Sequence, residues 1–312
     1  MNKLLLILLL VITQAASAQA LKIIVPGAPG TVTDVIARVY AAGLGDLYKK
    51  PVAVINRPGA AGIPGALAAA RADDDTILLG SSTSLVLNKL VYKKLPYDPD
   101  TELTPVFSVG WFTNVVAVGQ NVPVNDLREL ISYIKMKPNK LSIGVSNMNN
   151  LPHIALNAFA RTVGGEIYFI PYTGQSTSNG ILDVVAGRID GFIDGEAFVR
   201  AHVEAGKMKV VAAATRKRIE KYPSTQALSE VIPGFHGAGW MVITAPAVMT
   251  EDQLRKLNRD AQIVNMMATV SNRLDALGIV DRGGDLSHAR RVLSEERATW
   301  QKQITAAGIQ PE

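Results

Sequence analysis

The polar side chains most able to do chemistry in this sequence stand in short loops between apolar and helical stretches. The first such loop, "PGAPGT", follows the apolar run "KIIV" and precedes a helical pattern that begins near Asp34. The first turn of a helix has N–H groups without intrahelical partners and a partial positive charge, so it attracts anions. Gly27 and Gly30 would leave these amides accessible, and Thr31 and Thr33 would cap the helix or add donors. The loop either binds an anion or is an ordinary strand-to-helix turn.

The sequence lacks the common signatures of catalytic, nucleotide-binding and metal sites. It contains no G-x-x-x-x-G-K-[ST], G-x-G-x-x-G, G-x-S-x-G or H-E-x-x-H motif. None of its four histidines has a second histidine at metal-ligand spacing: His153, His202, His236 and His288. An exported hydrolase that uses Ser81 or Ser146 with His153 is an alternative, but it would lack a nucleophile elbow and a third catalytic residue. We therefore expect no enzyme activity, no cofactor and no metal.

A short apolar run, a polar loop and a helical pattern recur together along the chain. This unit appears in "KIIVPGAPGTVTDVIARVY", "TILLGSSTSLVLNKL", "LSIGVSNMNNLPHIALNAFA", "IYFIPYTGQSTSNGILDVVA" and "GFIDGEAFVRAHVEAG". Such alternation predicts an α/β fold with largely parallel sheets. Between Asp34 and Leu44, apolar residues recur near helical spacing and can cover one face of a sheet. In such folds ligands bind where strand ends meet helix starts.

Residues 1–20 have the organisation of a secretory signal peptide. Lys3 precedes an apolar core from Leu4 to Ile12, and small residues surround Ala18. This core is shorter than the roughly 20 residues that cross a bilayer, so we expect a cleaved signal rather than a retained anchor. The sequence therefore predicts export to the periplasm.

Composition narrows the class of protein further. The 312 residues are 48% hydrophobic, which is enough for one large or two ordinary domains, and we expect two. The absence of cysteine excludes disulfides, thiolate chemistry and a lipid-modified amino-terminal cysteine. The 32 basic and 27 acidic residues give a formal charge of +5, but the basic residues are scattered, so we expect no nucleic-acid partner.

Several strings, taken in order, resemble one known family. They are "VPGAPGTVTD", "NRPGAAGIPG", "LPYDPDTELTPV", "IPYTG", "AGRIDGFID" and "AGKMKVVAAATRKR", followed by "YPSTQALSEVIPGF" and "GWMVITAP". Through them the chain resembles the periplasmic solute receptors of tripartite tricarboxylate transporters, often called the Bug family. The resemblance covers nearly the whole mature chain.

This resemblance implies an α/β, two-lobed periplasmic-binding-protein fold. Each lobe would be a mainly parallel sheet flanked by helices, and crossover strands would join the lobes. We expect lobe one to comprise residues 21–118 plus 240–312, and lobe two residues 119–239. The apolar runs "FTNVVAV" and "GWMVITAP" suit the crossovers, and Trp240 would brace the hinge or simply fill the core.

The resemblance also places a small carboxylate in the cleft, bound mainly by two strand-to-helix loops, residues 27–34 and 146–150. Relatives usually have Pro-Gly-Gly where this chain has Pro29-Gly30-Thr31. They usually have two glycines and a serine where this chain has three asparagines. Each asparagine would either be a turn residue that tolerates left-handed backbone angles or read a polar group of the ligand.

Further candidates follow the other strands, and two acids match family positions at the cleft. Asp34 and Asp194 would orient waters, bind a ligand ammonium group or simply stabilise helix starts. The full set of expected ligand contacts is Gly27, Ala28, Gly30, Thr31, Thr33, Asp34, Ser81, Ser82, Ser146, Asn147, Asn149, Asn150, Tyr172, Thr173 and Asp194.

The function that the resemblance implies is an extracytoplasmic solute receptor. It would bind a small organic acid by closure of two lobes about a hinge, with no covalent chemistry, and deliver it to a membrane permease of the tripartite tricarboxylate type. A ligand-sensing subunit that reports to a signalling partner is the alternative. We expect the receptor to be a monomer.

Overall fold

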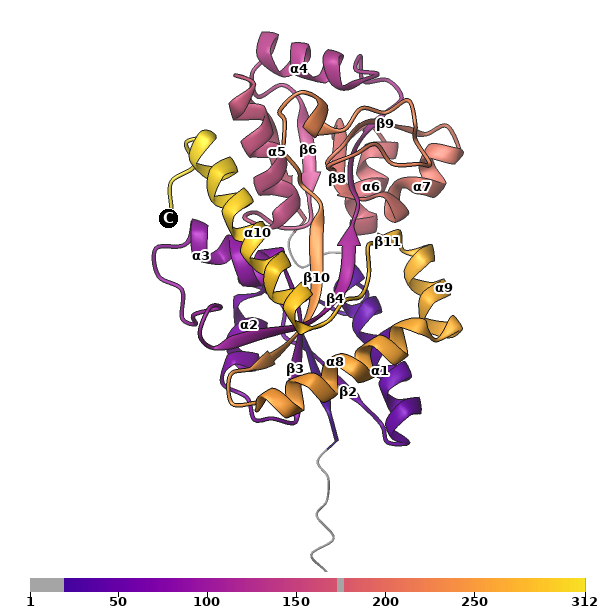
Figure 1. Cartoon of the computed structure of the whole chain (residues 1–312). Helices are drawn as coiled ribbons and strands as arrows, with labels where there is room; N and C mark the ends of the chain where they lie inside the picture. The colour runs from indigo at the N-terminus through magenta and orange to yellow at the C-terminus, as the bar shows by residue number, and fades with distance from the viewer. Residues whose placement is uncertain (1–19, 173–176, 312) are drawn as a thin grey trace, which may run out of the picture.

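A computed structural model describes residues 20–172 and 177–311 of the chain. These residues form two lobes, each built on one sheet with helices around it (Figure 1). The predicted signal peptide, up to residue 19, and Thr173 of the expected site lie outside the described residues.

The first sheet has six strands in the order β11-β4-β10-β3-β1-β2. Strand β1 pairs in parallel with β2 and β3, whereas β10 runs antiparallel to both β3 and β4. The short strand β11 pairs antiparallel with β4 at the edge. The bounds are β1 Lys22–Val25, β2 Ala53–Asn56, β3 Thr76–Ser81, β4 Leu103–Phe112, β10 Gly239–Pro246 and β11 Ile279–Val280.

The second sheet has five strands in the order β7-β6-β8-β5-β9. Strand β6 is parallel to β7 and β8, and β5 is antiparallel to β8 and β9. The two-lobed α/β fold is therefore confirmed, but both sheets are mixed, because β5 and β10 run against their neighbours. The bounds are β5 Asn114–Gly119, β6 Ser142–Val145, β7 Tyr168–Pro171, β8 Gly191–Gly195 and β9 Met208–Ala213.

Helices cover both sheets. Those around the first sheet are α1 Val32–Tyr48, α2 Ile63–Ala70, α3 Asn88–Val91, α8 Glu251–Met266, α9 Ala268–Ala276 and α10 Leu286–Ala306. Those around the second are α4 Leu127–Met136, α5 Leu151–Thr162, α6 Thr177–Val185 and α7 Glu196–Glu204. Single-turn helices are η1 Ala60–Gly62, η2 Thr83–Leu87 and η3 Leu228–Glu230. Within the described ranges, no helix combines the length and apolar character that a membrane span requires.

Helix α1 shows how the periodic pattern produces this packing. Ile36, Tyr40 and Leu44 repeat every four residues, and all three are fully buried in the core of the first lobe. The helix predicted between residues 34 and 44 lies inside α1, which extends further at both ends. Its first turn is thereby fixed at the carboxyl end of β1.

The chain changes sheets twice, and the two crossings are hydrogen-bonded to each other. The first is at Thr113, because β4 ends at residue 112 and β5 already belongs to the second sheet. The expected lobe boundary at residue 118 therefore falls inside a second-sheet strand. The return runs through residues 214–238, so "GWMVITAP" is a first-sheet strand that follows the crossing. Asn114 Nδ2 donates to Gly237 O at 2.7 Å, and Ala214 N donates to Asn114 O at 2.9 Å.

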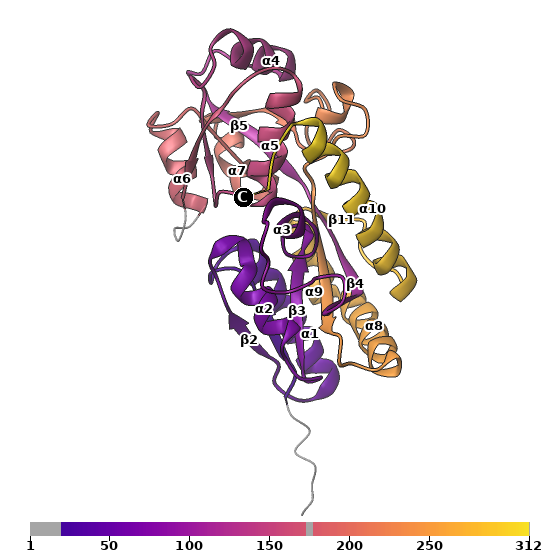
Figure 2. The same ribbon diagram turned by 90° about the vertical axis from the view of Figure 1, so that its left-hand side faces the viewer.

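Helix α10 links the lobes by a different route. It runs from the first lobe toward the second (Figure 2) and contacts α5 there. Ala307, directly after α10, packs in the core of the second lobe. The carboxyl-terminal part of the chain thus touches both lobes.

Candidate ligand-binding site

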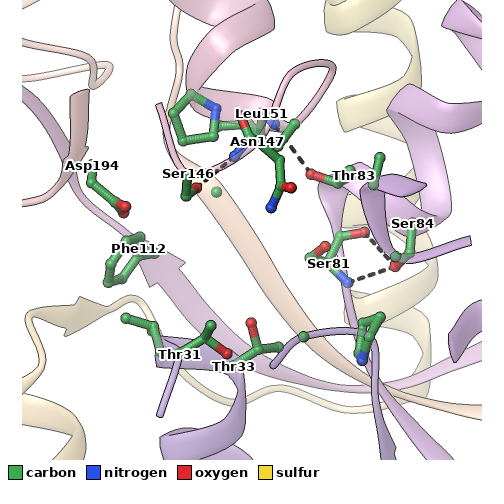
Figure 3. Close-up of a pocket in the computed structure, with 18 of the residues that line it drawn as sticks. Thr31, Thr33, Ser81, Thr83, Ser84, Phe112, Ser146, Asn147, Leu151 and Asp194 are labelled. Carbon is green, nitrogen blue, oxygen red and sulfur yellow. Dashed lines mark hydrogen bonds between the residues drawn. The ribbon is translucent and has the colours of Figure 1, made fainter. Parts of the chain in front are cut away.

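A cavity of about 390 Å³ lies between the lobes (Figure 3). Its first-lobe wall consists of Pro26, Gly27, Ala28, Thr31, Val32, Thr33, Pro58, Gly59, Ala61, Gly62, Ser81, Ser82, Thr83, Ser84, Gly239 and Met241, with Phe112 at the end of β4. Its second-lobe wall consists of Asn114, Ser146, Asn147, Asn150, Leu151, Pro152, Thr177, Asp194 and Phe198.

The loop between β1 and α1 presents the start of a long helix to this cavity. Thr31 closes the loop, because its N–H and its hydroxyl both donate to Ala28 O, at 3.2 and 2.8 Å. The first bond of the helix is Val35 N to Thr31 O, at 2.9 Å. Val32 and Thr33 line the cavity, and among the described hydrogen bonds none uses their N–H groups. The first turn of α1 therefore brings unpaired N–H groups and the Thr33 hydroxyl to residues of the cavity wall.

Gly30 and Asp34, both expected to contact the ligand, lie outside the lining and shape this loop instead. Gly30 has a φ of +81° and donates its N–H to Asp34 Oδ2 at 2.9 Å. Burial raises the pKa of Asp34, but hydrogen bonds from Arg38, Gly30 and Asn56 outweigh it and hold the pKa below its ordinary value. A Cβ at Gly30 would meet nothing within 4 Å, so a substitution there would strain the backbone rather than crowd a ligand.

The three asparagines between β6 and α5 have three different roles. Asn149 has a φ of +60° and lies outside the lining, so it is a left-handed turn residue. Asn150 caps α5, because its Oδ1 accepts from His153 N at 3.1 Å, and its Nδ2 donates to Ser146 Oγ at 2.8 Å. Asn147 points into the cavity (Figure 3). Sequence spacing alone does not distinguish these roles.

Ser81 and Ser82 both line the cavity, but the hydroxyl of Ser82 is already used. It accepts from Trp240 N at 3.0 Å and donates to Glu296 Oε2 at 3.0 Å. Trp240, fully buried, also donates its indole N–H to Ser108 Oγ at 2.9 Å, which ties β10 to β4. Ser82 therefore holds the cavity wall in place rather than offering a donor to a ligand.

Glu296, fully buried on α10, joins this wall to the returning crossover. Its Oε1 lies 3.1 Å from His236 Nε2 and 3.5 Å from Arg216 Nη2, both in residues 214–238. Its Oε2 also accepts from Trp300 Nε1 at 3.2 Å. A buried carboxylate with this many partners fixes the positions of all the segments it joins.

Asp194 lines the second-lobe wall and is only 8% exposed. Burial raises its pKa to about 6, against the opposing hydrogen bonds from Gly195 N and the Thr177 hydroxyl. Tyr172, by contrast, lies outside the lining and donates its hydroxyl to Asp183 Oδ2 at 2.6 Å. Of the two residues expected from "IPYTG", Tyr172 is therefore directed at α6 and Thr173 is not described.

Sequence reasoning missed several lining residues. Phe112 and Asn114 flank the first crossing, and the string "FTNVVAV" suggested only a crossover. Thr83 accepts from Leu151 N at 3.3 Å, a hydrogen bond that joins the two lobes beside the cavity (Figure 3). The serine and threonine run after β3 was the available signal for Thr83, since hydroxyl residues at a strand end commonly bind ligands or cap helices.

The cavity offers hydrogen-bond donors without a basic side chain. None of its described lining residues is Lys, Arg or His. Ser146 Oγ accepts from Asn150, which leaves its own hydrogen to donate, and Ser81 and Thr33 add further hydroxyls. Phe112, Phe198 and other apolar side chains complete the wall. The described residues contain no cluster of three potential metal ligands.

Several known bacterial proteins are similar to this chain in sequence and structure. A UPF0065 protein of Bordetella pertussis is 32% identical over 77% of this chain and 74% of its own length. A Rhodopseudomonas palustris protein solved as "Rpa4515 with adipate" has 29% identity and a TM-score of 0.84, covering 94% of this chain and 98% of that one. MatC from the same species, solved with bound malate, has a TM-score of 0.80 at 24% identity, covering 91% and 98%, and shows the same fold.

The family assignment agrees with the strings that suggested it. The model of the tripartite tricarboxylate transporter family receptor matches residues 36–309. That match spans both lobes, both crossings and α10. The resemblance to the Bug receptors is thereby confirmed, and the chain belongs to the receptor family of the tripartite tricarboxylate transporters.

Proposed function

We propose that this protein is a periplasmic receptor that binds a small carboxylate between its lobes and delivers it to a permease of the tripartite tricarboxylate type. The observation that carries the proposal is the first turn of α1: Val32 and Thr33 line the cavity, and their N–H groups have no described partner. A 17-residue helix places partial positive charge at that point.

The donors at the cavity are sufficient for useful affinity. Hydrogen bonds to a charged group contribute roughly 1.5–3 kcal/mol each. Four or so such bonds supply about 8 kcal/mol, which corresponds to a micromolar dissociation constant. A basic side chain is therefore not needed, and the adipate in the Rhodopseudomonas palustris relative supports an acid as the ligand.

Lobe closure would be the physical mechanism. The cavity draws its wall from both lobes, the crossings at Thr113 and residues 214–238 are hydrogen-bonded together, and Thr83 meets Leu151 across the cleft. Rotation about the paired crossings would open the cleft without breaking either sheet. The predicted signal peptide supports export, and the family supports a permease as the partner.

A thermal-shift screen followed by calorimetry tests the ligand class. The purified mature chain is screened against mono-, di- and tricarboxylates, aromatic acids and amino acids, with neutral sugars and simple cations as controls. An acid at a hundredfold excess over its dissociation constant should stabilise the fold by about 2.7 kcal/mol. A response to sugars or cations alone would refute the anion site. For the permease, deletion of the gene should slow cellular uptake of the acid identified, and unchanged uptake would argue against delivery.

A further inference from the structure

The start of α5 borders the cavity, but its backbone donors are already used. Leu151 N donates to Thr83 Oγ1 at 3.3 Å, and His153 N donates to Asn150 Oδ1 at 3.1 Å. Pro152, between them, has no N–H group. The described hydrogen bonds therefore use both N–H groups in the first turn of α5, whereas those in the first turn of α1 remain open to an anion.

Asp194 serves the two other helices that begin beside the cavity, α6 and α7. Thr177, the first residue of α6, donates its hydroxyl to Asp194 Oδ2 at 3.0 Å. Gly195, which precedes the first residue of α7, donates its N–H to Asp194 Oδ1 at 2.8 Å. A carboxylate at a helix start is favoured by the partial positive charge there. In the second lobe the protein's own acid thus takes the place that an anionic group of a ligand would take.

The charge of Asp194 is not balanced elsewhere in the wall. Among the described residues that line the cavity, Asp194 is the only ionisable one. Burial raises its pKa to about 6, so it remains mainly ionised at pH 7.5. It lies across the cavity from Ser81 and next to Phe112 (Figure 3). Phe112 and Phe198 both line the cavity and meet edge to face, with 6.4 Å between ring centroids. This side therefore combines a negative charge with apolar surface, and neither favours an anion.

The cavity is thus suited to one anionic group. The first turn of α1 offers unpaired N–H groups, whereas the helix starts of the second lobe are matched by Asn150, Thr83 and Asp194. We infer that the ligand carries a single carboxylate and an uncharged remainder, and that Asp194 rejects a second carboxylate. Asp194 would thereby be the residue that determines which acids bind. This inference rests on the proposed function, because it assumes a carboxylate at α1.

Matched acids that differ in the second carboxylate test the inference. Calorimetry at pH 7.5 compares succinate with succinamate and butyrate, adipate with its monoamide and hexanoate, and terephthalate with 4-carbamoylbenzoate and benzoate. The monoamide keeps the length and polarity of the diacid and removes one charge, and the third acid removes the polar group as well. In every series that binds, both monocarboxylates should bind about tenfold or more tightly than the dicarboxylate, because two like charges repel in a closed cavity.

Two variants show whether Asp194 causes the preference. Asp194→Asn removes the charge at nearly constant size and should reduce the ratio of the two affinities about fivefold or more, mainly by tightening the dicarboxylate. Asp252→Asn, which is exposed on α8 and outside the lining, makes the same change in charge and should leave the ratio unchanged. If Asp194→Asn does not fold, the ligand series on the wild-type protein still decides.

The outcomes separate this inference from the proposed function. Dicarboxylates that bind as tightly as their monoamides would overturn the inference and leave the proposed function standing. A preference that persists unchanged in Asp194→Asn would overturn the role of Asp194. If no acid binds, both the inference and the proposed function fail.

Discussion

A negative charge at Asn147 should oppose ligand binding, and the structure sets the size of the effect. Asn147 lines a cavity of about 390 Å³ in which no described wall residue is basic. A sphere of that volume has a radius of about 4.5 Å, so we take about 4.5 to 9 Å as the separation between a bound carboxylate and the substituted side chain. At an effective dielectric constant of about 20, two like charges at these distances repel by roughly 2 to 4 kcal/mol.

Asn147→Asp should therefore weaken binding of a carboxylate by about thirtyfold or more at pH 7.5. Calorimetry with the acid selected by the thermal-shift screen measures this directly. Asn149→Asp is the matched control, because it adds the same charge two positions away, outside the lining, and Asp tolerates the φ of +60° found there. Equal losses in the two variants would mean that the effect is a general one of net charge. Wild-type affinity in Asn147→Asp would mean that the ligand is not an anion in this cavity.

Three further predictions concern the loop, the buried acid and the hinge. Gly27→Val should weaken carboxylate binding at least tenfold in calorimetry, because a Cβ there would lie 2.8 Å from Thr31 Oγ1 at the cavity wall. Undiminished affinity would show that this loop is not part of the site. Burial raises the pKa of Asp194 to about 6, so the wild-type protein should lose stability as the pH rises from the unfolded pKa toward 6. The change that Asp194→Asn makes to the free energy of unfolding in urea should therefore be about 2 kcal/mol more favourable at pH 7.5 than at pH 4.5. The same change at both pH values would contradict the raised pKa. Glu296→Ala should lower the free energy of unfolding by about 3–5 kcal/mol in the same assay, because it leaves Arg216, Ser82 and Trp300 without their acceptor. Glu296→Gln should lower it less. Equal small losses in the two variants would argue against a buried network.

The sequence predicted the elements better than their assignment to sheets. Periodicity in α1 and the repeated strand-loop-helix unit depend on neighbouring residues, so they can be recognised locally. The first crossing depends on tertiary pairing. The strands β4 and β5 form one nearly continuous apolar run with only Thr113 between them, and nothing local marks the residue at which the chain changes partners.

The site was partly predictable, because its loops have local sequence patterns but the contacts of their side chains do not. Glycines, threonines and serines at strand ends correctly drew attention to loops that line the cavity, including Gly27, Thr33 and Ser146. The sequence did not show which hydroxyls are free, because Ser82 is occupied by Glu296, 214 positions away. Nor did it show that Asn149 has left-handed backbone angles while Asn147 faces the cavity. Such roles depend on contacts between distant segments.

The order of strands in the first sheet also has a consequence for how the chain assembles as it is synthesised. Strand β10 lies between β3 and β4, so before residues 239–246 emerge, β4 has no partner in its sheet and β1, β2 and β3 stand alone. The second sheet, in contrast, is complete once β9 ends at residue 213. A chain released from its amino terminus onward can therefore assemble the second lobe while the first is still in two parts. The amino-terminal strands must stay unaggregated until the last quarter of the protein arrives, so their unpaired edges are the part of the incomplete chain most open to aggregation.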